Sequence, residues 1–238
     1  MKKVLILLPV LFSVTFLFAQ NTIVHDANAE LRNISSFHAI EVSNGIDLLL
    51  KQGSQEAVAV SASDPEIRNR IKTVVENGTL KIYFDNKGLH ESNNKKNLKA
   101  YVSCKNIDGL EANSGADVNT DGNLSVGSLN ITLSSGADFD GMITATQLNI
   151  DQSSGSDMTI KGKVNDLKIT TTSGSDFNGY ELASETCQAD ASSGSDIEIT
   201  VNKTLQAQAS SGGGIKYKGN GVITNVSNSS GGKIKKQG

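Results

Sequence analysis

An internal repeat in the second half of the chain constrains the fold more than any other feature of this sequence. A short motif, two small polar residues followed by Gly, recurs seven times, and its glycines are separated by 21, 19, 19, 20, 18 and 19 residues. These glycines are Gly115, Gly136, Gly155, Gly174, Gly194, Gly212 and Gly231. A near-constant period of this length is typical of repeat architectures, in which each copy packs against its neighbours.

Apolar columns emerge when the copies are aligned on the central Gly. The residue five positions before it is apolar, as in Ile131 and Ile150, and so is the residue three positions after it, as in Val118 and Phe139. Polar residues alternate with these positions, which is the pattern of a strand with one buried face. One copy cannot bury that face alone, so the sequence predicts an all-β, parallel β-helix of about 19–20 residues per coil. Propeller blades, at about 40 residues, and leucine-rich repeats fit the period and columns less well.

Residues 20–104 differ in character and are predicted to form a strand-rich cap on the solenoid, which then occupies residues 105–238. Asp64 and Pro65 are typical of a helix N-terminus, and the short helix is expected to run to a stop near Asn77-Gly78. Expected strands cover residues 37–42, 46–50, 57–61, 80–84 and 98–103, and a loop covers 85–97. At the other end, Lys233, Lys235 and Lys236 are expected to discourage end-to-end pairing of the open coil.

The first nineteen residues are predicted to be an export signal. Lys2 and Lys3 precede an almost wholly apolar stretch from Val4 to Phe18, and Ala19 offers a small residue for cleavage. The alternative is a membrane anchor, but the stretch is shorter than the about 20 residues that a spanning helix needs. We therefore expect a protein of the periplasm, the outer cell surface or the surrounding medium, without a membrane span in the mature chain.

Composition excludes several functions. Lys and Arg number 22 against 25 Asp and Glu, and no long basic run occurs, which argues against nucleic acid as a partner. Three His and two Cys without a CxxC pair argue against structural zinc. Cys104 and Cys187 are more than four coils apart, too far for a disulfide, and both are expected to be buried, unpaired thiols.

An Asp stands two residues after the Gly in five consecutive copies, and these carboxylates are the candidate binding residues. They are Asp117, Asp138, Asp157, Asp176 and Asp196. Stacked about 4.8 Å apart, two such charges repel by about 0.9 kcal/mol in water. Three interpretations remain open: the carboxylates accept hydrogen bonds that lock the turns, they bind Ca²⁺ between coils, or they act as acid and base in a glycan-cleaving groove.

The Ser before each Gly is interpreted as part of a structural turn ladder and not as a nucleophile, because a nucleophile would be one special serine among the copies. Together with the glycines from Gly115 to Gly212, this ladder contains Ser114, Ser135, Ser154, Ser173, Ser193 and Ser211. No catalytic residue is assigned.

Two further motifs carry a family resemblance. They are Phe37-His38-Ala39-Ile40-Glu41-Val42-Ser43-Asn44-Gly45-Ile46-Asp47-Leu48 and Asn77-Gly78-Thr79-Leu80-Lys81-Ile82, which precede the serial Ser-Gly-Ala/Ser-Asp turns. With them the chain resembles the head GIN domain family of putative autotransporter adhesins, exported proteins of Bacteroidetes-type bacteria. The resemblance implies a right-handed β-helix and an adhesin-like role, and it supplies no catalytic residues.

The expected function is that of an exported, non-enzymatic scaffold or binding surface at the cell envelope. Its flat polar faces suit an extended glycan or a protein as partner, and no cofactor is required unless the Asp column takes Ca²⁺. A carbohydrate-active enzyme or glycan-binding module is the second hypothesis, and a calcium-dependent binding module is the third. The oligomeric state stays open.

Overall fold

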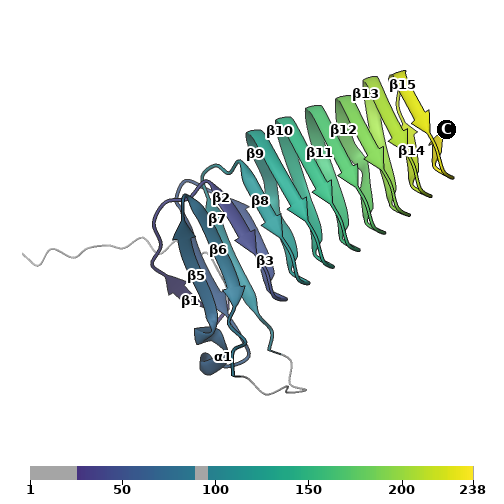
Figure 1. Cartoon of the computed structure of the whole chain (residues 1–238). Helices are drawn as coiled ribbons and strands as arrows, with labels where there is room; N and C mark the ends of the chain where they lie inside the picture. Colours follow the sequence, from purple (N-terminus) through teal and green to yellow (C-terminus); the bar gives the residue numbers. More distant parts are fainter. Residues whose placement is uncertain (1–25, 89–95, 238) are drawn as a thin grey trace, which may run out of the picture.

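A computed structural model describes residues 26–88 and 96–237 of the chain (Figure 1). The predicted export signal and most of the predicted loop at 85–97 lie outside the described residues. Within them the chain is almost entirely β-structure, which confirms the all-β prediction.

Sixteen strands and one short helix follow one another along the chain. They are β1 (Glu30–Arg32), β2 (Ala39–Val42), β3 (Asp47–Gln52), β4 (Ala57–Ser61), α1 (Pro65–Asn69), β5 (Ile71–Glu76), β6 (Thr79–Phe84), β7 (Lys99–Cys104), β8 (Gly109–Ala112), β9 (Asp117–Leu133), β10 (Asp138–Gln152), β11 (Asp157–Thr171), β12 (Asp176–Ala191), β13 (Asp196–Ala209), β14 (Gly214–Lys218), β15 (Val222–Asn228) and β16 (Lys233–Lys236). The helix α1, with its five residues, is far too short to cross a bilayer, and the described part of the chain contains no other helix.

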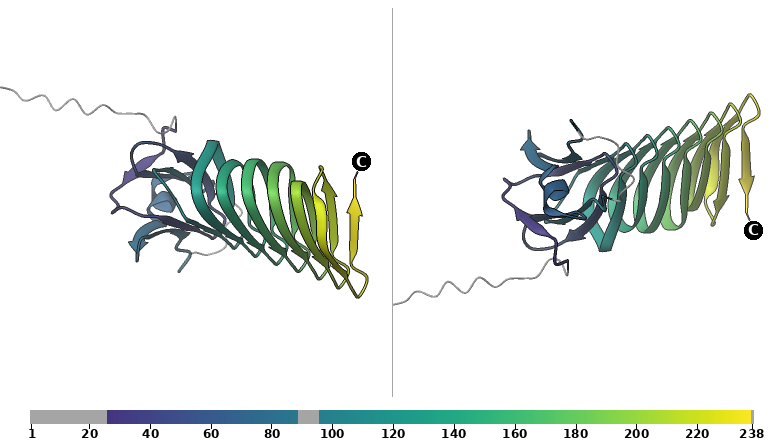
Figure 2. Two further views of the ribbon diagram at one scale, coloured as in Figure 1. Left: turned by 90° about the horizontal axis from the view of Figure 1, so that it is seen from above. Right: turned by 90° about the horizontal axis from the view of Figure 1, so that it is seen from below.

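The long strands β9 to β13 each wind once around the molecule and stack in parallel, so the predicted β-solenoid is confirmed (Figures 1 and 2). Equivalent residues of successive copies lie side by side, as Asp138 does with Asp157 and Leu148 with Leu167. The first halves of these strands, with β3, β14 and β16, form what we call the first sheet. Their second halves, with β2, β8 and β15, form the second sheet.

The core lies between the two sheets and consists of the predicted apolar columns. Phe139 and Phe177 from the first sheet are almost fully buried, as are Ile150 and Ile169 from the second. Cys187 pairs in register with Leu167 and Leu205, and its side chain is buried like theirs. Both cysteines are free and buried, which confirms the prediction made for them.

Each coil closes at a two-residue turn with an unusual backbone. The Ser of the turn has φ between 48° and 59° in all seven repeats, and the Gly after it is also in the left-handed region, with φ 71° at Gly115 and 83° at Gly231. Two consecutive positive φ angles define a type I′ turn, which favours Gly at the second position. No neighbouring atom would meet a Cβ at Gly155, so this Gly is required by its backbone angle and not by lack of space.

The solenoid extends further toward the N-terminus than the repeat motif does. Asn44 and Gly45, with φ of 63° and 68°, make an eighth turn of the same kind between β2 and β3. The Gly45 N–H donates to the Ser114 carbonyl oxygen at 3.1 Å, and the turn glycines from Gly115 to Gly212 donate to the next coil in the same way. The parallel sheets run across the boundary predicted at Cys104, because β2 pairs with β8 and β3 pairs with β9. The division into a cap and a solenoid at this residue stays a prediction.

Antiparallel strands close the N-terminal end. On the first sheet β7 is followed by β4 and β1, and on the second sheet β6 is followed by β5. The helix α1 has the predicted start, with the Asp64 carboxylate accepting a hydrogen bond from the Ile67 N–H at 2.9 Å. Its predicted extent was wrong, because the helix ends at Asn69 and residues 71–76 form β5. The run Thr73-Val74-Val75 favours a strand, and Asn77-Gly78 is the hairpin turn between β5 and β6.

Candidate functional site

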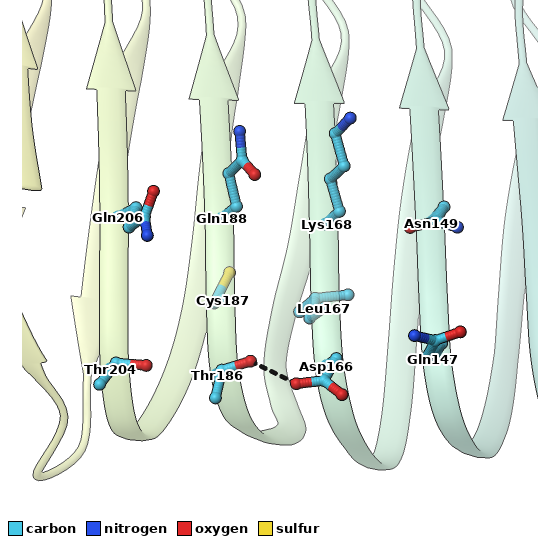
Figure 3. A pocket seen from close by; sticks show the side chains of 10 residues that line it. All are labelled: Gln147, Asn149, Asp166, Leu167, Lys168, Thr186, Cys187, Gln188, Thr204 and Gln206. Atoms are coloured by element: carbon cyan, nitrogen blue, oxygen red, sulfur yellow. Dashed lines mark hydrogen bonds between the residues drawn. The ribbon is translucent and has the colours of Figure 1, made fainter.

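An open groove of about 300 Å³ crosses the outer surface of the second sheet, from β10 to β13 (Figure 3). It is lined by ten residues, namely Gln147, Asn149, Asp166, Leu167, Lys168, Thr186, Cys187, Gln188, Thr204 and Gln206. The side chains of Leu167 and Cys187 are buried, with 3% and 4% of their surface exposed. The polar residues on either side of them therefore form the surface that a ligand would meet.

Two columns of polar side chains run along the groove. Gln147, Asp166, Thr186 and Thr204 form one, and Asn149, Lys168, Gln188 and Gln206 form the other. Each column repeats because its members stand eight or six residues before the turn Gly of their own coil. Since these positions alternate with inward apolar ones, the strand pattern turns all of them outward.

Only part of the hydrogen-bonding capacity of these columns is used within the protein. The Thr186 hydroxyl donates to Asp166 Oδ1 at 2.7 Å, and Asn149 Nδ2 donates to Asn130 Oδ1 at 2.9 Å, which extends the second column onto β9. Within the described part of the chain, the side chains of Gln147, Lys168 and Gln206 make no hydrogen bond. The groove thus presents free donors and acceptors at the spacing of the strands.

The predicted Asp column lies on the outer surface of the first sheet. All five candidate carboxylates stack in register, and Asp47 of β3 joins them ahead of Asp117. A second hollow of about 320 Å³ lies along this column, and Asp140 also lines it. The six carboxylates are Asp47, Asp117, Asp138, Asp157, Asp176 and Asp196.

The electrostatics of the column reflect this stacking. Partial burial, with the neighbouring charges of Asp138 and Asp47, raises the pKa of Asp117. Partial burial and the charges of Asp157 and Asp196 likewise raise the pKa of Asp176. Among the described residues, no Lys or Arg forms an ion pair with any of the six. The column is therefore a line of mutually repelling charges.

Few hydrogen bonds join the carboxylates of the column, and the carboxylates do not cluster. Asp138 Oδ1 accepts the backbone N–H of Asp157 at 3.3 Å, a contact between successive coils. In residues 26–88 and 96–237, no three His, Cys, Asp or Glu side chains converge as metal ligands would. The carboxylates run along the solenoid one per coil and do not surround a common point.

The serines of the turn ladder, which stand just before each Gly, lie at exposed turn tips. The residue just after each Gly points inward instead. Ser114 Oγ donates to Asn113 Oδ1 at 3.0 Å, a local contact within its turn. Beyond the Gly, Ser156, Ser175 and Ser195 are fully buried. The serines of the predicted ladder therefore form an outer row in the left-handed conformation, and Ser156, Ser175 and Ser195 form a separate, buried row that the sequence analysis did not predict.

Residues 36–221 match the family described as "Putative auto-transporter adhesin, head GIN domain". The chain belongs to this family. Membership agrees with the resemblance seen in the sequence, and a search of curated proteins found no match.

Solved structures of Bacteroidetes proteins share the family fold at low sequence identity. A putative adhesin from Bacteroides fragilis has a TM-score of 0.79 and 18% identity, over 88% of this chain and 96% of that one. A putative lipid binding protein from Parabacteroides distasonis has a TM-score of 0.68 and 19% identity, over 90% and 98%. A putative adhesin from the same species has a TM-score of 0.69 and 17% identity, over 88% and 96%. These likenesses establish the fold of the family member described here.

Proposed function

We propose that this protein is an exported, non-enzymatic, adhesin-like binding protein, and that it holds an extended glycan in the groove of the second sheet. The groove is the observation that carries the proposal, because it offers polar, hydrogen-bonding side chains at equivalent positions on four successive coils. The family description and the adhesin names among its structural relatives support a role in surface binding.

The spacing of the columns favours a polymer over a small molecule. Equivalent side chains recur about every 4.8 Å across a parallel sheet, which is close to the length of one sugar ring in an extended chain. Gln147, Lys168 and Gln206 retain free hydrogen-bonding groups, and a ligand spanning several coils would collect weak contacts from each. Amides, hydroxyls and single charges suit the hydroxyls of a neutral or weakly charged glycan.

A non-enzymatic role is favoured by the sameness of the candidate residues. Acid and base catalysis needs two carboxylates in different environments, whereas the Asp column repeats one environment coil after coil. Asp117 and Asp176 have their pKa shifted in the same direction and for the same reasons. The serines likewise recur at the turn tips of all seven repeats, with closely similar φ angles, and none of them stands apart as a nucleophile would.

A glycan binding screen with the mature chain tests the proposal. We expect extended glycans to bind, and the paired variant Gln188→Ala, Gln206→Ala to weaken their binding at least tenfold. The matched control is Asn178→Ala, which removes an exposed amide from the first sheet. Loss of binding in the control alone, or unchanged binding in the groove variant, would place the site elsewhere. Cell fractionation, with the protein found outside the cytoplasm, tests export separately.

A further inference from the structure

We propose that the C-terminal end of the solenoid is a dimer interface, in which β15 and β16 of one copy pair antiparallel with β16 and β15 of a second copy. This inference concerns assembly and does not depend on the proposed glycan groove. It rests on the exposure of inward-facing residues, on the free edges of both sheets, and on the charges of the two end strands.

An apolar column of the second sheet is open at this end. The column begins at Leu80 and passes through Ile40, Leu110 and the repeats to Ala207 and Val226. Leu80 and Ile40 are 0% and 1% exposed, but Val226 is 44% exposed although it occupies the same inward-facing position. Exposing such a residue forgoes the burial that every earlier coil gains. Within the residues that the structure describes, the core is therefore covered at the N-terminal end of this column and uncovered at Val226.

Both sheets also end in unpaired strand edges here. In the described part of the chain, β15 pairs only with β13, and β16 pairs only with β14 (Figure 2). A free edge presents a row of unpaired backbone N–H and C=O groups, which another strand can satisfy. At the opposite end the last described strands, β1 and β5, also pair on one side only, but they run antiparallel to their neighbours β4 and β6, so the two ends are not equivalent.

The heights at which the sheets end select one arrangement of two copies. Beyond β13, in residues 210–237, the first sheet has two more strands, β14 and β16, whereas the second sheet has only β15. A two-fold axis parallel to the strands exchanges the sheets, so that each protruding β16 meets the shorter end of the partner at its β15. The strands of the two sheets run in opposite directions, so both contacts are antiparallel. An axis across the strands would instead join β16 to β16 and hold the two β15 strands apart.

The charges of the end strands favour the same arrangement. β16 carries Lys233, Lys235 and Lys236, and pairing it with its own copy would place like charges opposite one another. β15 has the sequence VITNVSN and no charged residue. Pairing it with β16 of the partner therefore places no like charge opposite the lysines. The lysines that were expected to discourage end-to-end pairing thus disfavour one pairing and leave the other available.

Sedimentation equilibrium of the chain without its predicted signal peptide tests the proposal, with Asn225 of β15 as the probe. Asn225→Glu would face the lysines of the partner, and we expect it to tighten the dimer by about 3–10-fold at low salt, since two exposed ion pairs form. Asn225→Lys is expected to weaken it by a similar factor. Added salt should remove both effects. Asn178→Lys, in a middle coil of the first sheet, is the control and should leave the dimer unchanged.

A monomer at all concentrations, or a dimer that responds equally to Asn225→Glu and Asn225→Lys, would overturn the proposal. Longer assemblies would point to head-to-tail stacking and would also overturn it. Circular dichroism of each variant separates weakened pairing from loss of the fold.

Discussion

Gly155 donates its backbone N–H to the carbonyl oxygen of Ser173 in the next coil, with an N···O distance of 3.2 Å. The same bond joins the turns along the solenoid, from Gly45 to Ser114 at one end and from Gly212 to Ser230 at the other. The left-handed backbone at both residues of each turn orients these groups along the axis. The turns are therefore a continuous hydrogen-bonded row and not separate loops.

The backbone of these turns predicts that Asn stabilises the fold more than Ser does at the first residue of each turn. Ser173 has φ 58°, a region that costs most L-residues about 1–2 kcal/mol and that Asn adopts more readily. Ser173→Asn should raise the free energy of unfolding in urea by about 0.5–1 kcal/mol. Ser128→Asn, at an exposed strand position, is the control and should give no gain. An equal effect of the two substitutions would contradict this account of the turn.

A buried hydroxyl pair below the turns gives a second prediction. Thr171 Oγ1 donates to Ser195 Oγ at 3.0 Å, and both residues are fully buried. Ser195→Ala should cost about 1–3 kcal/mol of unfolding free energy, because it removes Ser195 Oγ, the acceptor for the Thr171 hydroxyl and for the Ser192 N–H. The double variant Thr171→Val, Ser195→Ala removes both polar groups and should be more stable than Ser195→Ala alone. Purely additive losses in urea unfolding would show that the two hydroxyls do not depend on each other.

The solenoid itself could be predicted from the sequence, because its period and its apolar columns repeat often enough to identify inward positions. The alignment of the repeats did not include the turn copy that contains Asn44, Gly45 and Asp47. This copy lies 70 residues before the next one, with β4 to β7 between them. Its signal was present, since Asn-Gly-Ile-Asp matches the turn motif once Asn replaces Ser in the left-handed position. The end of α1 could not be predicted, because residues 71–76 become a strand through their pairing with β6, which local sequence does not show.

The groove could not be predicted in the same way. Most outward positions of the solenoid carry a polar residue, so Gln188 and Gln206 look no different in sequence from Asn178. Only the arrangement of the coils shows which outward columns border a hollow. The burial of Ser195 could not be predicted either, since the sequence Ser-Ser-Gly-Ser does not distinguish an exposed serine from a buried one.

The Asp column predicts a weak, unselective response to divalent cations. Its carboxylates lie one per coil, and no three of the described acidic side chains converge on one point as Ca²⁺ ligands do. We expect millimolar Ca²⁺ and Mg²⁺ to raise the melting temperature by similar, small amounts through screening. Asp157→Asn should reduce both responses equally. Stoichiometric Ca²⁺ binding by calorimetry, absent with Mg²⁺, would instead establish the calcium-dependent binding module.

The same column predicts an unusual pH dependence of stability. Partial burial and the charges of Asp157 and Asp196 raise the pKa of Asp176 above the ordinary value of 3.8. Between that value and the raised one, the folded protein binds more protons than the unfolded chain, so the contribution of Asp176 to stability improves as the pH falls from neutral toward about 4. It is least favourable above the raised pKa, where the carboxylate is ionised in both states.

Asp176→Asn removes this titration and tests the prediction. The variant should be more stable than the parent at pH 7, by about 1 kcal/mol at low salt, because repulsion from two neighbours is lost. Its advantage should shrink as the pH falls through the raised pKa of Asp176, because the parent carboxylate then becomes protonated as well. Asp151→Asn changes an exposed carboxylate on the second sheet, outside the column, and should show no such convergence. Urea unfolding across this pH range measures both variants, and a gain for Asp176→Asn that persists unchanged to pH 4 would mean that lost charge repulsion is not its cause.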